Sequence, residues 1–154
     1  MAVILANEQT DRVDTAELRL IAETVLREEG YPESTEVTIL LVSEDEIADY
    51  NARYLSKEGP TDVLSFPIED LTPGSVPEID PDGPPLVIGD VVISPSYVQR
   101  AAAAMGVAYE DEMALMVAHG ILHLLGYDHE EDDEAVVMEE RERQLLTMVG
   151  RRRR

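Results

Sequence analysis

The chain contains no cysteine among its 154 residues. This absence excludes a disulfide framework and any zinc site built from thiolates. No apolar stretch approaches the length of about 20 residues that crosses a bilayer, and the longest, 113–125, includes two histidines and a glycine. The first eight residues lack the basic lead of a signal peptide and predict a strand. We therefore expect a soluble cytoplasmic protein without a membrane partner.

Positive charge is also scarce. The chain has 12 basic residues against 33 acidic ones, a net charge of -21. An acidic surface repels nucleic-acid phosphates, although Arg53, Lys57, Arg100, the arginines at 151–154 or a bound divalent ion could each attract them locally. Two explanations of the acidity stay open: a salty cytosol, in which screening is short-ranged, and an ordinary acidic protein from an arginine-biased genome, which we favour.

The length and the absence of internal repeats predict one domain over residues 1–150, followed by a disordered basic tail at 151–154. Apolar and β-branched runs predict four strands, at 2–6, 36–42, 62–67 and 86–93. Capping signals at Asp14, Ser43 and Ser94-Pro95 and glycines at helix ends predict helices. Their approximate ranges are 14–30, 44–54, 95–105, 109–125 and 131–149. The proline-rich stretch 69–85 predicts a mobile loop. This pattern indicates one sheet with helices packed on it.

All three histidines fall within the eleven residues from His119 to His129. His119 and His123 are four apart, so on a helix they share one face. Gly126 stands where that helix would end, and the returning chain can bring His129 to the same point. Three imidazoles with a fourth position left open are typical of a catalytic zinc site.

A cluster of hydrogen-bonded core histidines is the alternative. The segment around these histidines is apolar on almost every side, which predicts a buried helix. Each imidazole left unpaired there would cost about 1–3 kcal/mol. A metal ion removes both costs at once, so we favour the metal site.

The spacing of the histidines is also that of metzincin proteases. Those enzymes carry a glutamate general base directly after the first histidine, and this chain has Gly120 there. The peptidase mechanism therefore lacks its usual base. Hydrolysis stays open, because water bound to zinc has a pKa near ~7.

Three segments resemble the YbeY family of bacterial endoribonucleases and rRNA maturation factors. The segment 119–129 matches the family's histidine signature at every fixed position. The second block comprises Asn51, Tyr54, Lys57 and residues 60–67, and the third is 86–93 with its Gly89-Asp90 pair. The resemblance covers residues 35–130 well and the ends loosely.

The resemblance implies an α+β domain with one four-stranded, mostly parallel sheet and about five helices, with the metal site on a helix and its following turn. It implies one zinc ion per chain, held by His119, His123 and His129. It further implies single-strand-specific cleavage of rRNA precursors near the 3′ end of the small-subunit rRNA, a role in ribosome quality control, and the ribosome or its small subunit as partner.

Two catalytic roles are expected beside the metal ligands. Many family members carry an arginine directly after the Tyr54 position, and here Leu55 replaces it. Contact with the RNA phosphate would then fall to Lys57, unless Lys57 is an ordinary exposed loop lysine. Asp128 would orient a histidine or assist proton transfer, unless it only forms the turn. Glu112 could support the site, but an ordinary first-turn acid is the favoured interpretation.

Three functions follow from these features. The first is a metal-dependent endoribonuclease for rRNA, and the second is a metallohydrolase of peptides or other small esters and amides. The third is a non-catalytic ribosome-assembly factor in which the metal only stabilises the fold. The metal used in the cell, the cleavage position, the general base and the oligomeric state stay open.

Overall fold

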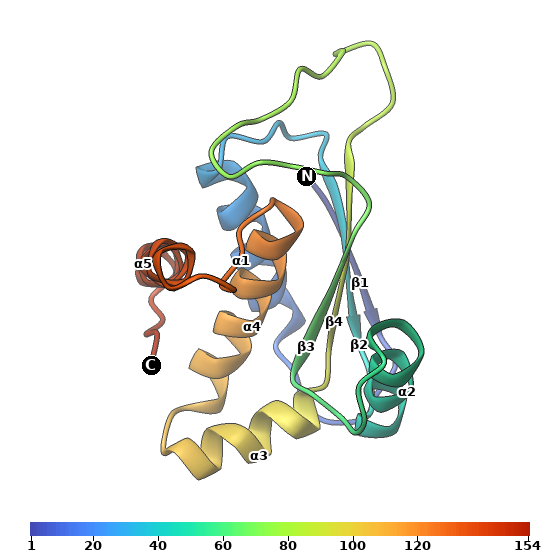
Figure 1. The fold of residues 1–154 in the computed structure, drawn as a ribbon, viewed down its shortest axis with the longest axis vertical. Helices are drawn as coiled ribbons and strands as arrows, with labels where there is room; N and C mark the ends of the chain where they lie inside the picture. The colour runs from blue at the N-terminus through green and yellow to red at the C-terminus, as the bar shows by residue number, and fades with distance from the viewer.

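A computed structural model describes residues 1–154 and shows one mixed four-stranded sheet (Figure 1). The strands are β1 (Ala2–Asn7), β2 (Glu36–Leu41), β3 (Val63–Pro67) and β4 (Val87–Ile93). Their order in the sheet is β1-β2-β4-β3. The pairs β1-β2 and β2-β4 are parallel, and β3 pairs with β4 in the antiparallel direction. The predicted α+β class with a mostly parallel sheet is confirmed.

Five helices accompany the sheet: α1 (Thr15–Glu28), α2 (Glu44–Leu55), α3 (Pro95–Met105), α4 (Tyr109–Leu124) and α5 (Asp132–Met148). Two capping predictions are confirmed, since Asp14 and Ser43 each accept a hydrogen bond from the backbone N–H three residues on. The predicted helix start at Ser94-Pro95 is also confirmed, since Ser94 is the N-cap residue of α3 and Pro95 is its first residue. Unlike Asp14 and Ser43, Ser94 makes no capping hydrogen bond with its side chain, because its hydroxyl is buried without a partner.

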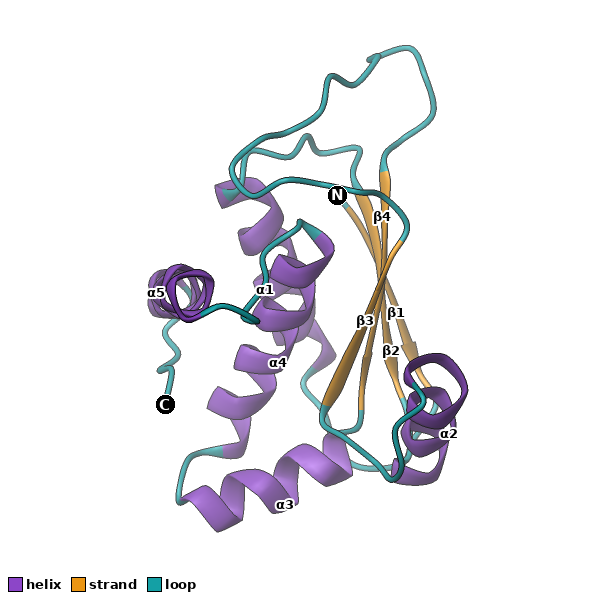
Figure 2. Cartoon of the chain, viewed as in Figure 1, coloured by secondary structure: helices purple, strands orange, loops and turns teal.

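Helix α4 lies at the centre of the molecule. It contacts α1, α3 and α5 as well as strands β3 and β4. Figures 1 and 2 show α1 and α4 on one face of the sheet and α2 on the other. Consequently α4 is buried on nearly all sides, and eleven of its sixteen residues are inaccessible. No helix of the protein is both long and apolar enough to span a membrane.

Gly120 allows α4 to approach the sheet closely. A Cβ atom at this position would lie 2.5 Å from Val91 Cγ1, which is too close for any real side chain. In the same contact, Ser65 on β3 donates a hydrogen bond of 2.9 Å to the Gly120 carbonyl. A glutamate in place of Gly120 would therefore meet the sheet, so packing explains why the metzincin base is missing here.

The predicted loop and the predicted tail both lie outside the regular elements. Residues 68–86 join β3 to β4 as a long excursion without helix or strand, as predicted. Residues 151–154 also form no helix or strand. Three of their four arginines nevertheless contact acidic side chains of the domain, which the prediction of a disordered tail did not anticipate.

Candidate metal centre

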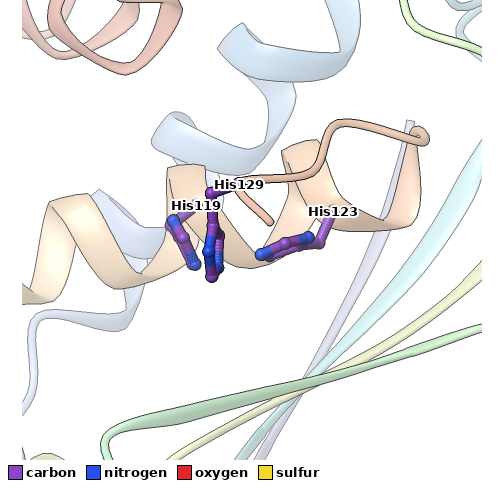
Figure 3. A group of neighbouring side chains, drawn as sticks. All are labelled: His119, His123 and His129. Carbon is purple, nitrogen blue, oxygen red and sulfur yellow. The ribbon is translucent and has the colours of Figure 1, made fainter. Parts of the chain in front are cut away.

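His119 and His123 project from the same face of α4, as their spacing predicts. Their ring centroids lie 4.6 Å apart and the rings stand nearly perpendicular to each other. Figure 3 shows both imidazoles directed into the space between α4 and the strands. The position of α4 against the sheet, set by Gly120, therefore also sets the position of two histidines.

His129 reaches the same space through a glycine turn at the end of α4. Gly126 has φ +100°, and the N–H groups of Gly126 and Tyr127 bond back to the His123 and Leu122 carbonyls at 3.1 and 3.0 Å. These two bonds form a Schellman motif, which ends a helix and reverses the chain. The ring of His129 lies 5.3 and 4.9 Å from those of His119 and His123. One ligand atom from each residue falls within 4.8 Å of the others, a separation that suits a single metal ion.

Asp128 occupies the turn itself. Its carboxylate accepts a 2.7 Å hydrogen bond from the backbone N–H of His129. This bond orders the segment that carries His129, which fits the turn-forming role. Asp128 does not line the cavity beside the histidines. Its predicted catalytic role stays a prediction.

The sequence analysis missed Glu142, which reaches His119 from α5. Its Oε2 lies 2.7 Å from His119 Nδ1, and only 1 % of its side chain is exposed. Burial raises the pKa of this carboxyl, but the hydrogen bonds and charges of His119 and Arg153 together hold it below the ordinary value. A signal was present: Glu142 falls on the same helical face as the buried Met138 and Leu145, where a carboxylate needs a partner.

The pKa of His123 is strongly lowered. Burial first, and then the proximity of His119 and His129, lowers its pKa to about 4. Its imidazole is therefore neutral at pH 7, which is the state that binds metal. With Nδ1 of His119 engaged by an ionised carboxylate, His119 presents Nε2 to the shared space.

A cavity of about 400 Å³ opens beside the histidines. Its twelve lining residues come from four parts of the chain: the end of α2, the following loop, β3 and the three histidines. They are Asn51, Leu55, Lys57, Thr61, Asp62, Val63, Leu64, Ser65, Pro67, His119, His123 and His129. The cavity thus brings together the histidine signature and the second block of the sequence, including Lys57 and the divergent Leu55.

Asn51 is a second residue whose role was missed. It is 5 % exposed, and its side-chain amide donates a 3.0 Å hydrogen bond to the Gly59 carbonyl. The backbone carbonyl of Asn51 accepts a hydrogen bond from the Lys57 backbone N–H at 3.2 Å. Asn51 therefore fixes the loop that carries Lys57 against α2.

Glu112 does not support the histidines. It is buried on α4, and its carboxylate accepts a 2.9 Å bond from Arg154. Arg53 is likewise engaged elsewhere, in an exposed pair with Asp49 at 2.9 Å. Lys57 is therefore the cationic side chain in the wall of the cavity.

The donor set fits a metal ion. Three imidazoles converge, one is held neutral by burial, and one lies within hydrogen-bond distance of a buried carboxylate, an arrangement typical of histidine metal sites. Imidazole ligands suit zinc, copper, iron or nickel, so the donor set by itself does not select the element. Fold and site together define an α+β protein of the metallohydrolase class, with three histidines at an open cavity.

Comparison with known proteins identifies the family. The family model described as Endoribonuclease YbeY matches residues 4–150. A protein of Acidothermus cellulolyticus named endoribonuclease YbeY is 45% identical over 148 residues, covering 96% of this chain and 90% of its own. Its namesake from Mycolicibacterium smegmatis is 38% identical over 146 residues, covering 95% and 82%.

A solved structure agrees with this relationship. The solution structure of a Thermotoga maritima protein matches with a TM-score of 0.65 and 29% identity, covering 96% of this chain and 88% of its own. The chain belongs to the YbeY family of endoribonucleases. This membership confirms the predicted resemblance and the prediction of an enzyme of the hydrolase class.

Proposed function

We propose that this protein is a zinc-dependent, single-strand-specific endoribonuclease that matures the 3′ end of small-subunit rRNA and serves ribosome quality control in the cytoplasm. The observation that carries the proposal is the three-histidine cluster in the wall of a 400 Å³ cavity, in a chain whose relatives are named endoribonuclease. An rRNA precursor and the small ribosomal subunit are its proposed partners.

The cavity suits a segment of single-stranded RNA. Its volume lies within the usual range of ligand sites, about 300–1,000 Å³. It runs from the histidines to the end of α2, so that a strand bound across β3 would meet both.

Each residue of the wall has a proposed task. His119, His123 and His129 would hold one zinc ion, which when bound supplies a Lewis acid for a phosphate oxygen and a site for the attacking water. Lys57 would bind a phosphate as a point charge. With Leu55 in place of the family arginine, this lysine carries the phosphate contact in the loop alone. Asp128 would keep His129 in place through the hydrogen bond to its N–H.

The alternatives are weaker on specific grounds. A metzincin-like peptidase needs a carboxylate after the first histidine, and Val91 leaves no room for a side chain there. A purely structural metal would be expected in a closed, four-ligand site. Here the histidines border an open cavity, which favours catalysis over the non-catalytic assembly factor.

Cleavage of RNA by matched variants tests the proposal. Purified protein with zinc should cut a fragment that carries the single-stranded 3′ extension of the small-subunit rRNA. The His123→Ala variant should lose activity by at least ~100-fold, because one of three ligands is gone. The exposed Arg152 provides a control, and Arg152→Ala should cut at the wild-type rate. Equal cutting by wild type and His123→Ala would contradict the proposal.

A further inference from the structure

The arginines at the end of the chain turn back onto the domain. Helix α5 ends in a second Schellman motif, in which Gly150 has φ +75° and the N–H of Arg151 bonds to the Leu146 carbonyl at 2.9 Å. Figure 1 shows the tail leaving the end of α5 on the side of the sheet where α1 and α4 lie. The direction of the tail is thus set by the helix end.

Three tail arginines each bind a different carboxylate. Arg151 pairs with Glu17 of α1 at 2.9 Å, and Arg154 pairs with the buried Glu112 of α4 at 2.9 Å. Arg153 pairs with Glu142 of α5 at 3.0 Å. Arg152 is exposed and forms no ion pair. The tail therefore links three helices, and one of its arginines does not take part.

Arg153 is connected to the metal centre through one side chain. The Glu142 carboxylate uses Oε1 to accept from Arg153 Nε at 3.0 Å and Oε2 to bind His119 Nδ1 at 2.7 Å. The side chains of Arg153 and Glu142 are only 13 % and 1 % exposed. A carboxylate so deeply buried requires a partner for each oxygen, since water cannot replace one that is lost.

We propose that Glu142 and Arg153 are positioning residues, which hold His119 with Nδ1 protonated and Nε2 facing His123 and His129. Arg153 fixes the carboxylate, and the carboxylate fixes the imidazole. Neither residue lines the cavity beside the histidines. The inference rests on the metal site of the proposed function, because it concerns how one ligand of that site is oriented.

The geometry assigns distinct effects to distinct variants. In Glu142→Gln the amide offers one acceptor and one donor group, whereas His119 and Arg153 both donate, so one of the two bonds is lost. In Arg153→Ala the carboxylate keeps His119 but can rotate away from it. Arg153→Lys retains a charge near Glu142 and should recover part of the loss. Arg152→Ala removes one tail charge without removing a contact.

Zinc affinity is the first measurement. The dissociation constant for zinc alone is determined by competition with a chelator on metal-free protein, at fixed pH and salt. We expect Glu142→Gln to bind about 10- to 100-fold more weakly than wild type. Arg153→Ala should bind several-fold more weakly, Arg153→Lys should lie between it and wild type, and Arg152→Ala should match wild type.

The imidazole nitrogens of His119 provide a readout that does not depend on metal. In the metal-free wild type, ¹⁵N NMR should show His119 as the Nδ1–H tautomer, and Glu142→Gln should shift this ring toward a tautomer mixture. A merely structural role of Glu142 would lower stability without changing this signal. Circular dichroism identifies any variant that fails to fold, and the milder Arg153→Lys then carries the comparison.

The outcomes separate the two proposals. Wild-type zinc affinity in both Glu142→Gln and Arg153→Ala would overturn the inference, as would equal losses in Arg152→Ala and Arg153→Ala. A wild-type protein that binds no zinc would contradict the proposed function instead. In that case the tautomer of His119 still decides whether Glu142 positions this ring.

Discussion

Helices α4 and α5 end in the same local motif but use it differently. In both, a glycine with positive φ reverses the chain, and the residue three positions later joins the same group of side chains: His129 after Gly126 and Arg153 after Gly150. A Cβ at Gly126 would lie 2.1 Å from the Leu71 carbonyl oxygen, whereas nothing lies within 4 Å of one at Gly150. The turn at Gly126 is therefore fixed by packing and the turn at Gly150 by ion pairs. The same motif thus positions the candidate ligand His129 in one case and the arginine tail in the other.

Replacing each of the two glycines with alanine tests most directly whether the two turns are held in different ways. Gly126→Ala forces a left-handed residue against the backbone of Leu71, whose side chain packs on the core, and we expect a loss of about 2–4 kcal/mol in the free energy of unfolding together with weaker zinc binding. Gly150→Ala should lower the free energy of unfolding by only about 1–2 kcal/mol, the cost of placing alanine in a left-handed conformation. Urea unfolding in the presence of a chelator measures the stability of each variant, and titration with zinc measures its affinity for the metal. Equal effects of the two substitutions would show that packing does not distinguish the turns.

Lowering the pH should destabilise the surroundings of His123 before it changes the charge of the tail arginines. The pKa of His123 is about 4 in the folded state and near 6.5 when unfolded, so the unfolded chain takes up more protons as the pH falls. The contribution of His123 to the free energy of unfolding is complete above pH 6.5. It is lost as the pH falls toward 4, by up to ~3 kcal/mol in metal-free protein. Urea unfolding between pH 7.5 and 4.5 measures it.

The control for this prediction removes the titrating ring. His123→Gln should flatten the dependence between pH 6.5 and 4.5, a range in which the arginines of the tail keep their charge. A wild-type curve that is already flat there would contradict a neutral, buried His123.

Gly120→Ala tests the contact that places two of the histidines. The added methyl group would lie 2.5 Å from Val91 Cγ1, so α4 must move away from the sheet or Val91 must change its rotamer. We expect a destabilisation of about 1–3 kcal/mol in thermal or urea unfolding. Val91→Ala in the same chain should restore part of the loss. Additive losses in the double variant would mean that the two positions do not collide.

Asn51→Ala should have the smallest effect on stability, about 1 kcal/mol, since it removes one side-chain hydrogen bond to Gly59. Its effect should appear at Lys57, whose loop is released from α2. RNA affinity should therefore fall more than zinc affinity, and isothermal titration with each ligand separates the two. An equal fall in both would place Asn51 with the metal centre instead of the loop.

Much of the fold follows from local patterns in the chain. The helix starts at Asp14 and Ser43 were predictable because a side-chain oxygen three residues before an acid satisfies backbone N–H groups locally. The histidine cluster was predictable for the same reason, since a four-residue spacing fixes one helical face and a glycine fixes the reversal. Ser94 also begins a helix as predicted, but the burial of its hydroxyl without a hydrogen-bond partner is something that no local pattern records.

The remaining features depend on contacts between distant segments. Glu142 lies 23 positions from His119, and Asn51 controls a loop through Gly59, so neither role has a short-range signature beyond a polar residue on a buried face. The tail arginines resemble any basic terminus until their partners on other helices are known. Reciprocal pairs of this kind are specified only when the helices are packed together.

The sequence by itself determined the three candidate ligands, their convergence and the absence of a metzincin base, because each depends on spacing along one helix and its turn. Only the tertiary structure decided why that base is absent, which nitrogen His119 presents and what the arginine tail binds. Those features arise where α4 meets β4, α5 and the tail. The physical reason is range: backbone periodicity acts over a few residues, whereas burial and charge pairing act between elements that only folding brings together.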